Sequence, residues 1–294
     1  MLLDAEKIKS SVNRRSFLKN AGAGTAAVAA LGLATPKSLF ASSTSTPLPA
    51  DTPAQIFTAA LVAEDLAITF YYNGLIGGVI QDPNLAGPGG TADNVSSGGS
   101  ATNVGYLRAA LHQEMAHAQL FRTLLGFADP LGNPAGDPYT KFYLPTGTFS
   151  SLYPFIGVLE ALENAFIAAY LAAVQEFSLL AAQGTPLTLG GTTYQPATLA
   201  YFAQVAASIL GIESEHRALG RAIPPDLIPA NNLNYEQQNG IFTVYNGTTS
   251  AVAALTPFLA PGSGLTEYDF VTAYNAAHTL TAVSTGTIPT NYFG

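Results

Sequence analysis

A motif that occurs twice, Glu-x-x-His, constrains this sequence more than any other feature. Glu114 and His117 form the first copy, and Glu213 and His216 form the second. Each copy lies in a stretch whose apolar residues recur with the period of a helix. Residues at positions i and i+3 share one face of a helix, so each copy projects a carboxylate and an imidazole together.

A lone glutamate in an apolar helical stretch precedes each copy by 50 residues. These glutamates are Glu64 and Glu163, and each is followed seven residues later by a tyrosine, Tyr71 or Tyr170. The order Glu, Glu-x-x-His, Glu, Glu-x-x-His is the one by which four helices of one bundle supply a dinuclear carboxylate metal site. We expect both tyrosines to be core aromatic residues, with a redox or hydrogen-bonding role as the alternative.

The pattern is specific because ionisable residues are scarce. Charged residues make up 10% of the 294 residues, whereas about a quarter is usual. Beyond residue 41 the chain has nine Glu and four His, and four of those Glu and two of those His fall into the pattern. The chain has no Cys, which excludes disulfides, thiolate zinc sites and iron–sulfur clusters.

Residues 1–41 predict an export signal. They hold six of the eleven Lys and Arg residues, including Arg14 and Arg15, ahead of an Ala/Gly-rich apolar stretch at 21–34. This stretch is shorter than a membrane span of about 20 residues. The segment resembles a twin-arginine signal. The resemblance implies the twin-arginine export machinery as a partner, a periplasmic or extracellular location, and metal loading before export. The alternative is that these residues are an uncleaved membrane anchor or a disordered tail.

The rest of the chain is acidic. Residues 42–294 have five basic and seventeen acidic residues, a net charge of −12. This charge argues against nucleic acid or an anionic membrane as a partner. It is compatible with the attraction of cations.

Apolar periodicity predicts an all-α fold, a four-helix bundle over residues 53–222 with long loops. A Ser/Thr/Pro-rich linker at 42–52 precedes it, and a C-terminal loop and helix extension at 223–294 follows it. The expected helices cover 53–77, 103–127, 150–182 and 196–222. The expected connections are a Gly/Asn/Ser-rich loop at 81–102, an irregular Pro-rich segment at 129–148 and a hairpin at 185–195. Short helices are expected at 248–259 and 265–280.

The residue types in the pattern suit a pair of metal ions. Carboxylate oxygens and neutral imidazole nitrogens are ligands for iron and manganese ions. Four carboxylates bring four negative charges, which two divalent ions balance. Without metal, buried carboxylates would repel one another and take up protons. A solvated helix face is the alternative explanation, but the apolar surroundings of these glutamates favour a metal site.

On these residues the chain resembles the ferritin-like superfamily of di-iron carboxylate bundles, over about residues 53–222. More narrowly, it resembles the exported ferritin-like domain family that includes desiccation-related proteins. The resemblance implies two metal ions, with iron expected first and manganese as the alternative. The ligand roles that it implies are terminal for Glu64 and Glu163, bridging for Glu114 and Glu213, and imidazole donation for His117 and His216.

Several neighbouring residues stay open at this stage. Glu160 lies one turn before Glu163, and rubrerythrin-like peroxidases carry an additional carboxylate on this helix. Their built-in electron relay needs Cys, however, and is excluded here. Glu215 is expected to be solvated or to pair with Arg217 or Arg221. His112 is expected at the surface or behind the ligands.

Three functions compete. The first is an exported di-iron protein that reacts Fe(II) with O2 or peroxide in stress protection. The second is an enzyme like manganese catalase, which disproportionates peroxide without an external reductant. The third is a non-catalytic desiccation or stress protein in which metal is incidental. A closed iron-storage cage is less expected because long loops and the C-terminal extension would have to fit its shell. The sequence leaves open whether the protein forms a homo-oligomer.

Overall fold

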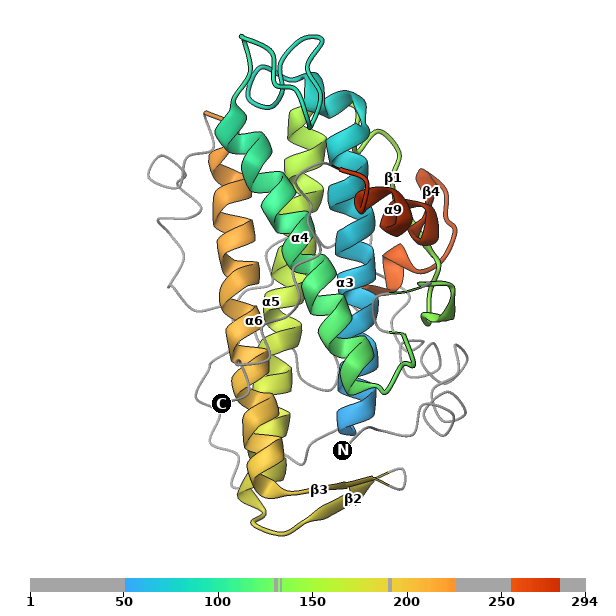
Figure 1. Cartoon of the computed structure of the whole chain (residues 1–294), viewed down its shortest axis with the longest axis vertical. Coiled ribbons are helices and arrows are strands. Elements are labelled where there is room, and N and C mark those ends of the chain that lie inside the picture. The colour runs from blue at the N-terminus through green and yellow to red at the C-terminus, as the bar shows by residue number, and fades with distance from the viewer. Residues whose placement is uncertain (1–50, 130–131, 133, 190–191, 226–254, 281–294) are drawn as a thin grey trace.

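The protein is built on four long helices that run side by side (Figure 1). The computed structural model describes residues 51–129, 132, 134–189, 192–225 and 255–280. The four helices are α3 (Pro53–Ile76), α4 (Ala101–Leu124), α5 (Leu152–Ala182) and α6 (Pro196–Ala222). The predicted all-α bundle is therefore confirmed, and each predicted helix end lies within three residues of the observed one.

Local sequence signals explain where α3 begins and ends. The side chain of Thr52 accepts a hydrogen bond from the backbone N–H of Gln55, and the Gln55 side chain accepts one from the backbone N–H of Thr52. This capping box satisfies N–H groups that the first turn leaves unpaired. Pro53 occupies the first turn, where its missing N–H costs nothing. The helix ends at Ile76 and is capped by Gly77, where a Cβ would lie 2.7 Å from the Asn73 carbonyl oxygen and 2.8 Å from Phe149.

The helices associate as two pairs. Helix α3 packs most extensively against α4, and α5 packs most extensively against α6. The contacts between the pairs, α3 with α5 and α4 with α6, are less extensive. The loop before α4 lies at one end of the bundle, and a short hairpin of β2 (Leu187–Leu189) and β3 (Thr192–Tyr194) lies at the other (Figure 1). The predicted hairpin is therefore confirmed.

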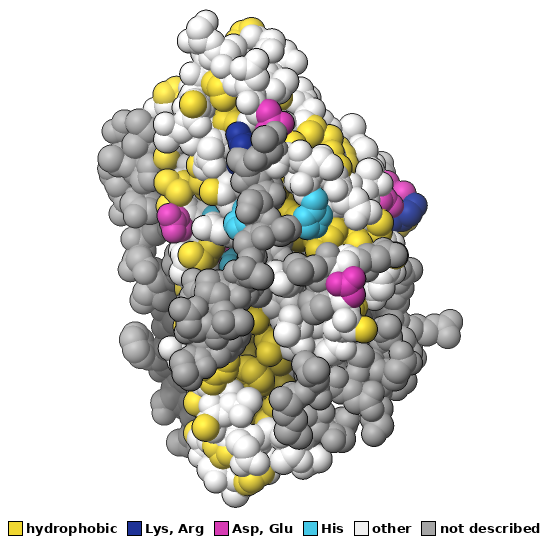
Figure 2. Space-filling model, viewed as in Figure 1, with side chains coloured by type: hydrophobic (Ala, Val, Ile, Leu, Met, Phe, Trp, Pro, Cys, Tyr) yellow, Lys and Arg dark blue, Asp and Glu magenta, His cyan; other side chains and the backbone are white. Residues whose placement is uncertain are grey.

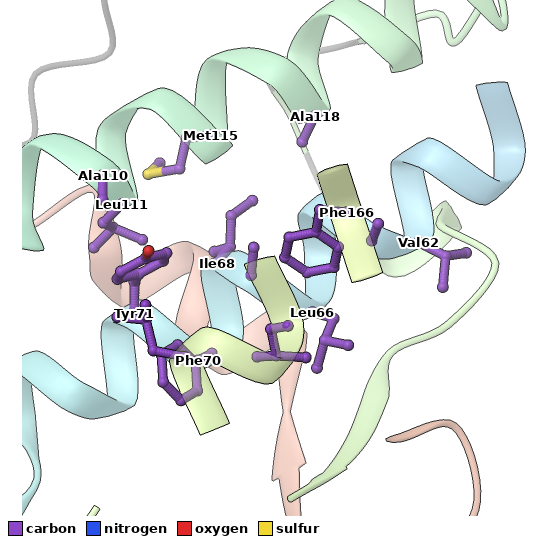
Figure 3. Close-up of a cluster of buried hydrophobic side chains, with 14 of the residues drawn as sticks. Val62, Leu66, Ile68, Phe70, Tyr71, Ala110, Leu111, Met115, Ala118 and Phe166 are labelled. Carbon is purple, nitrogen blue, oxygen red and sulfur yellow. The ribbon is translucent and has the colours of Figure 1, made fainter. Parts of the chain in front are cut away.

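Apolar side chains fill the space between the helices (Figure 3). The rings of Phe70 and Phe155 are stacked with their centroids 4.8 Å apart, which joins α3 to α5. On α4, Leu111 and Met115 are buried on either side of Glu114 in the sequence. The predicted site residues therefore lie within the core.

Two expectations about the connections were wrong. The segment at 129–148 contains a strand, β1 (Lys141–Pro145), and the stretch at 265–280 begins with another, β4 (Leu265–Asp269). The two strands pair antiparallel, with Lys141 opposite Asp269. Each strand has five residues and its partner lies over a hundred residues away, so neither leaves a local periodic signal. A helix follows only from Phe270, as α9 (Phe270–Ala277), and packs against α3.

A buried arginine joins the C-terminal layer to the bundle. The Arg122 Nε on α4 donates to both Asp137 oxygens, at 2.9 and 3.2 Å, and Nη2 donates to Asp65 on α3 at 3.4 Å. The guanidinium carbon lies 4.7 Å from the ring centroid of Tyr274 on α9. Arg122 is almost completely buried. The charge network therefore connects α3, α4, the loop after α4 and α9.

Three short 3-10 turns complete the described elements, η1 (Gly78–Gln81), η2 (Pro134–Gly136) and η4 (Thr256–Phe258). The last of them lies where the helix at 248–259 was expected, but residues 248–254 fall outside the described part of the chain. The predicted export signal at 1–41 and the linker as far as residue 50 also lie outside it. These expectations stay predictions.

Helices α3, α5 and α6 are long and apolar enough to cross a membrane, by length and composition alone. Most of the apolar 18-residue stretch of α3 is buried within the bundle. Smaller shares of the corresponding stretches of α5 and α6 are buried. Each helix carries one buried glutamate of the motif, Glu64, Glu163 or Glu213. The face in Figure 2 has few charged side chains and scattered apolar ones. Burial of the glutamates within the bundle, away from lipid, is the less costly arrangement for such groups.

The Arg122 network yields a prediction about stability. Replacement of Arg122 by Met leaves Asp137 buried without its cation, and we expect the free energy of unfolding to fall by about 3–5 kcal/mol. Urea denaturation followed by far-UV circular dichroism measures this change. Lys141→Met is the control, because Lys141 and its partner Glu267 are both exposed and their pair should contribute nothing measurable. Equal unfolding midpoints for wild type and Arg122→Met would show that the network does not stabilise the fold.

Candidate metal centre

The bundle brings all six predicted ligands to one place in its core. We call these residues the Glu–His cluster; they are Glu64 on α3, Glu114 and His117 on α4, Glu163 on α5, and Glu213 and His216 on α6. The four glutamates and His216 are buried. The side chain of His117 is 13% exposed. That these residues bind metal stays a prediction.

The ligand atoms of the cluster form two overlapping groups. One group contains Glu64, Glu114, His117 and Glu213, and the other contains Glu163, Glu114, His216 and Glu213. Within each group the ligand atoms lie within 4.8 Å of one another. Glu114 and Glu213 belong to both groups. Two cation positions that share these carboxylates fit such an arrangement.

Each of the two shared carboxylates directs one oxygen toward His117 and the other toward His216. Glu114 places Oε2 3.3 Å from Nδ1 of His117 and Oε1 3.0 Å from Nδ1 of His216. Glu213 places Oε1 3.4 Å from Nδ1 of His117 and Oε2 3.3 Å from Nδ1 of His216. Both glutamates therefore have the orientation that a bridge between two cations requires.

The lone glutamates complete one group each. Glu64 Oε2 lies 3.3 Å from Nδ1 of His117, and Glu163 Oε1 lies 3.9 Å from Nδ1 of His216. Each imidazole thus faces one carboxylate of its own and both shared ones. The same arrangement of ligand atoms thus occurs twice in the bundle, and the residues of the α3–α4 pair correspond to those of the α5–α6 pair.

Buried polar atoms without a hydrogen bond indicate whether these residues fit a pair of metal ions. Five buried atoms of the cluster make no hydrogen bond of acceptable geometry; they are Glu114 Oε1, Glu163 Oε2, both carboxylate oxygens of Glu213, and His216 Nδ1. Buried polar atoms are almost always hydrogen-bonded, so such a concentration needs a cause. All five are carboxylate oxygens or an imidazole nitrogen, which are donors to iron and manganese. The residues therefore fit the metal pair.

Burial and mutual charge shift the protonation of the metal-free cluster. Burial raises the pKa values of Glu64 and Glu163 well above their usual range. At Glu114 burial also favours the neutral acid, but the charge of His216 and the hydrogen bond from His117 outweigh it and lower the pKa. Burial acts to lower the pKa of His216, but Glu114 overcomes this and raises it to about 11. In the metal-free state, protons thus take the place of cations.

Two tyrosines reach across the bundle to the lone glutamates. The hydroxyl of Tyr71 on α3 donates to Glu163 Oε1 on α5 at 2.5 Å, and that of Tyr170 on α5 donates to Glu64 Oε1 on α3. Both tyrosines are buried, as expected of core aromatic residues. They also make the hydrogen bonds that the alternative interpretation allowed. The sequence did not indicate the partners, because the seven-residue spacing predicts a shared helix face but not the partner helix.

Two further residues that the pattern did not single out contact His216. Gln113 Oε1 lies 2.7 Å from His216 Nε2, and the Tyr106 hydroxyl donates to the backbone carbonyl oxygen of His216. Both residues are on α4. The only sequence signal for Gln113 is its position directly before Glu114, which alone does not indicate a contact with another helix.

The residues left open by the sequence lie outside the Glu–His cluster. Glu160 Oε1 is 3.0 Å from Nε of Arg221, and the Glu160 side chain is about one-third exposed. Arg217 donates to Asn164 at 2.8 Å. Glu215 is exposed and His112 is half-buried. None of these residues belongs to either group of gathered ligand atoms.

Comparison with known proteins supports the fold. Residues 52–185 match the family model described as a ferritin-like domain. The match covers α3, α4 and α5 and ends before α6, so the structure is what places Glu213 and His216 beside the other ligands. No curated protein and no solved structure matches the chain.

The tyrosine contacts lead to a prediction. Tyr71→Phe and Tyr170→Phe each leave a buried carboxylate without its donor, which should lower the free energy of unfolding of the metal-stripped protein by about 1–3 kcal/mol. Urea denaturation in the presence of a chelator measures the change. Tyr72→Phe is the matched control, because Tyr72 is only partly buried and its hydroxyl makes no hydrogen bond with a residue in the described part of the chain. Three indistinguishable unfolding curves would contradict the crosswise hydrogen bonds.

Proposed function

We propose that this chain, which belongs to the ferritin-like superfamily, binds two metal ions in the Glu–His cluster and uses them in redox chemistry. Iron is the first candidate, and the reaction is oxidation of Fe(II) by O2 or peroxide. The membership in the superfamily and the buried cluster of glutamates and histidines support a metal carboxylate protein. The identity and number of the ions, and the reaction, belong to the proposal.

The observation that carries the proposal is the sharing of Glu114 and Glu213 between the two groups of ligand atoms. A single cation would need only one of these groups. Four carboxylates in an apolar core carry four negative charges, which two divalent ions neutralise. Unpaired charges in such a core are costly. A second cation would therefore remove the cost of the two negative charges that a single divalent ion leaves unbalanced.

Each glutamate of the cluster has a definite task in this proposal. Glu114 and Glu213 would hold the two ions at a fixed separation, and Glu64 and Glu163 would each bind one ion from the outside. Tyr71 and Tyr170 donate hydrogen bonds to the outer carboxylates, which fixes their orientation. When bound, a pair of Fe(II) ions supplies one electron each and, with two protons, reduces one hydrogen peroxide to two waters.

A second candidate is peroxide disproportionation with manganese. The cluster offers the same oxygen and nitrogen ligands to Mn(II) as to Fe(II). The chain has no Cys and hence no thiolate relay to receive electrons from a reductant. Disproportionation needs no reductant, since two hydrogen peroxide molecules give two waters and one O2. This feature of the sequence favours the manganese reaction.

The cellular setting of the proposal rests on the N-terminal sequence. Arg14 and Arg15 precede an apolar stretch in the manner of a twin-arginine signal. We propose export of the folded, metal-loaded protein to the periplasm or beyond, and a role in oxidative or desiccation stress.

Metal content tests the binding proposal. Elemental analysis of the purified protein should find about two Fe or Mn ions per chain, and Glu114→Ala/Glu213→Ala should lose both because it removes the shared ligands. Glu215→Gln is the control, since Glu215 is exposed on α6 two residues from Glu213. Absence of metal in wild type, with no uptake of added Fe(II) or Mn(II), would reject the proposal and leave a structural role.

The reaction is tested separately. We expect protein loaded anaerobically with Fe(II) to give Fe(III) absorbance on addition of peroxide, with about one peroxide consumed per two Fe(II) oxidised, because each ion gives one electron. Oxygen evolution from peroxide by Mn-loaded protein, measured with an oxygen electrode and without reductant, would instead select the catalase-like candidate. Failure of both loaded forms to exceed free metal would refute a redox function while leaving metal binding intact.

A further inference from the structure

The Glu–His cluster has two halves, one that contains His117 and Glu64 and one that contains His216 and Glu163. The halves differ in the residues that contact each imidazole on the side away from the carboxylates. Behind His216, Gln113 Oε1 lies 2.7 Å from the outer ring nitrogen Nε2. The inner nitrogen Nδ1 faces the carboxylates of Glu114 and Glu213. The ring of His216 is therefore held between α4 on one side and the cluster on the other.

The contact with Gln113 determines which nitrogen of His216 is free to bind a cation. An amide oxygen only accepts hydrogen bonds, so the ring must donate its Nε2–H to Gln113. In neutral imidazole one nitrogen carries the proton and the other has the lone pair. The lone pair then lies on Nδ1, the nitrogen that faces the carboxylates. A partner of this kind orients a ligating histidine and fixes its tautomer.

The backbone of His216 is supported from the same side. The Tyr106 hydroxyl, also on α4, donates to the carbonyl oxygen of His216. Together, Gln113 and Tyr106 hold both the ring and the main chain of this residue. The His216 side chain is only 2% exposed.

The corresponding supports are missing from the other half. Gln113 directly precedes Glu114, whereas the residue directly before Glu213 is Ile212. Tyr106 lies eight residues before Glu114, whereas Val205 lies eight residues before Glu213. Neither Ile212 nor Val205 has a polar side chain.

His117 is correspondingly less constrained. Each of its polar contacts with residues in the described part of the chain goes through Nδ1, to Glu64, Glu114 and Glu213. No described residue fixes its Nε2. Its side chain is 13% exposed, compared with 2% for His216.

We propose that Gln113 is a positioning residue that makes the two metal positions unequal, so that the position beside His216 binds more tightly and fills first. The position beside His117 binds more weakly and exchanges its ion. This inference rests on the proposed metal binding and adds to it an order of loading and the residue that causes it. Loss of such a partner typically weakens metal affinity by about 10–100-fold.

Titration with Mn(II) alone, with free Mn(II) followed by its EPR signal, tests the inference without any activity measurement. Wild type should bind two ions in two classes of different affinity. Gln113→Leu should weaken the tight class by about 10–100-fold while the total stays at two ions. Gln113→Glu should retain the tight class, because its carboxylate also accepts the Nε2–H. Gln119→Leu, the same change six residues along α4, should leave both classes unaltered.

Anomalous diffraction from crystals with one equivalent of Mn(II) locates the first ion, which we expect beside His216 and Glu163. An ion beside His117 instead, or two classes of equal affinity in wild type, would overturn this inference and leave the proposed function standing. An unchanged tight class in Gln113→Leu would overturn the role of Gln113 in the same way. No Mn(II) or Fe(II) binding by wild type at all would overturn both proposals.

Discussion

Four carboxylates that face one another inside an apolar bundle are the constraint on which the rest of this structure depends. Glu64, Glu114, Glu163 and Glu213 are each at most 2% exposed, and charges in such a place are costly unless they are balanced. The two imidazoles and the two tyrosine hydroxyls reduce this cost, but five buried atoms stay without a hydrogen bond. Ordinary packing would not retain such a cluster, because apolar residues of similar volume avoid its cost. The proposed pair of cations would balance these charges and would explain why the carboxylates are retained.

The helices and the cluster could be predicted because their signals are local. Helix α6 begins at Pro196 and ends at Ala222, as the proline at its start and the pair Pro224-Pro225 after its end indicate. The i, i+3 spacing of Glu114 and His117 requires only a helix to place both on one face. Two copies of that spacing, each preceded by a buried glutamate, then point to a shared interior.

The contacts that were not predicted all depend on distant parts of the chain. The partner strands β1 and β4 are separated by the whole of α5 and α6. Arg122 lies in a helix whose sequence gives no sign that Asp65 and Asp137 will surround it. Gln113 reads as an ordinary polar residue on α4 until α6 is placed beside it. Sequence periodicity assigns a face to a residue, but the partner across that face comes only from the assembled fold.

The polar contacts of the site join helices that otherwise contact each other little. Contact between helices is most extensive within the α3–α4 and α5–α6 pairs and smaller between the pairs. The hydrogen bonds of Tyr71 and Tyr170 join α3 to α5, and those of Gln113 and Tyr106 join α4 to α6. Glu114 and Glu213 face each imidazole from both pairs. Each group of ligand atoms draws on three helices and on both helix pairs, so a cation bound there would favour the assembled bundle over its separated helix pairs and would stabilise it by mass action. If the cluster binds metal as proposed, metal occupancy and the association of the two helix pairs would therefore be linked.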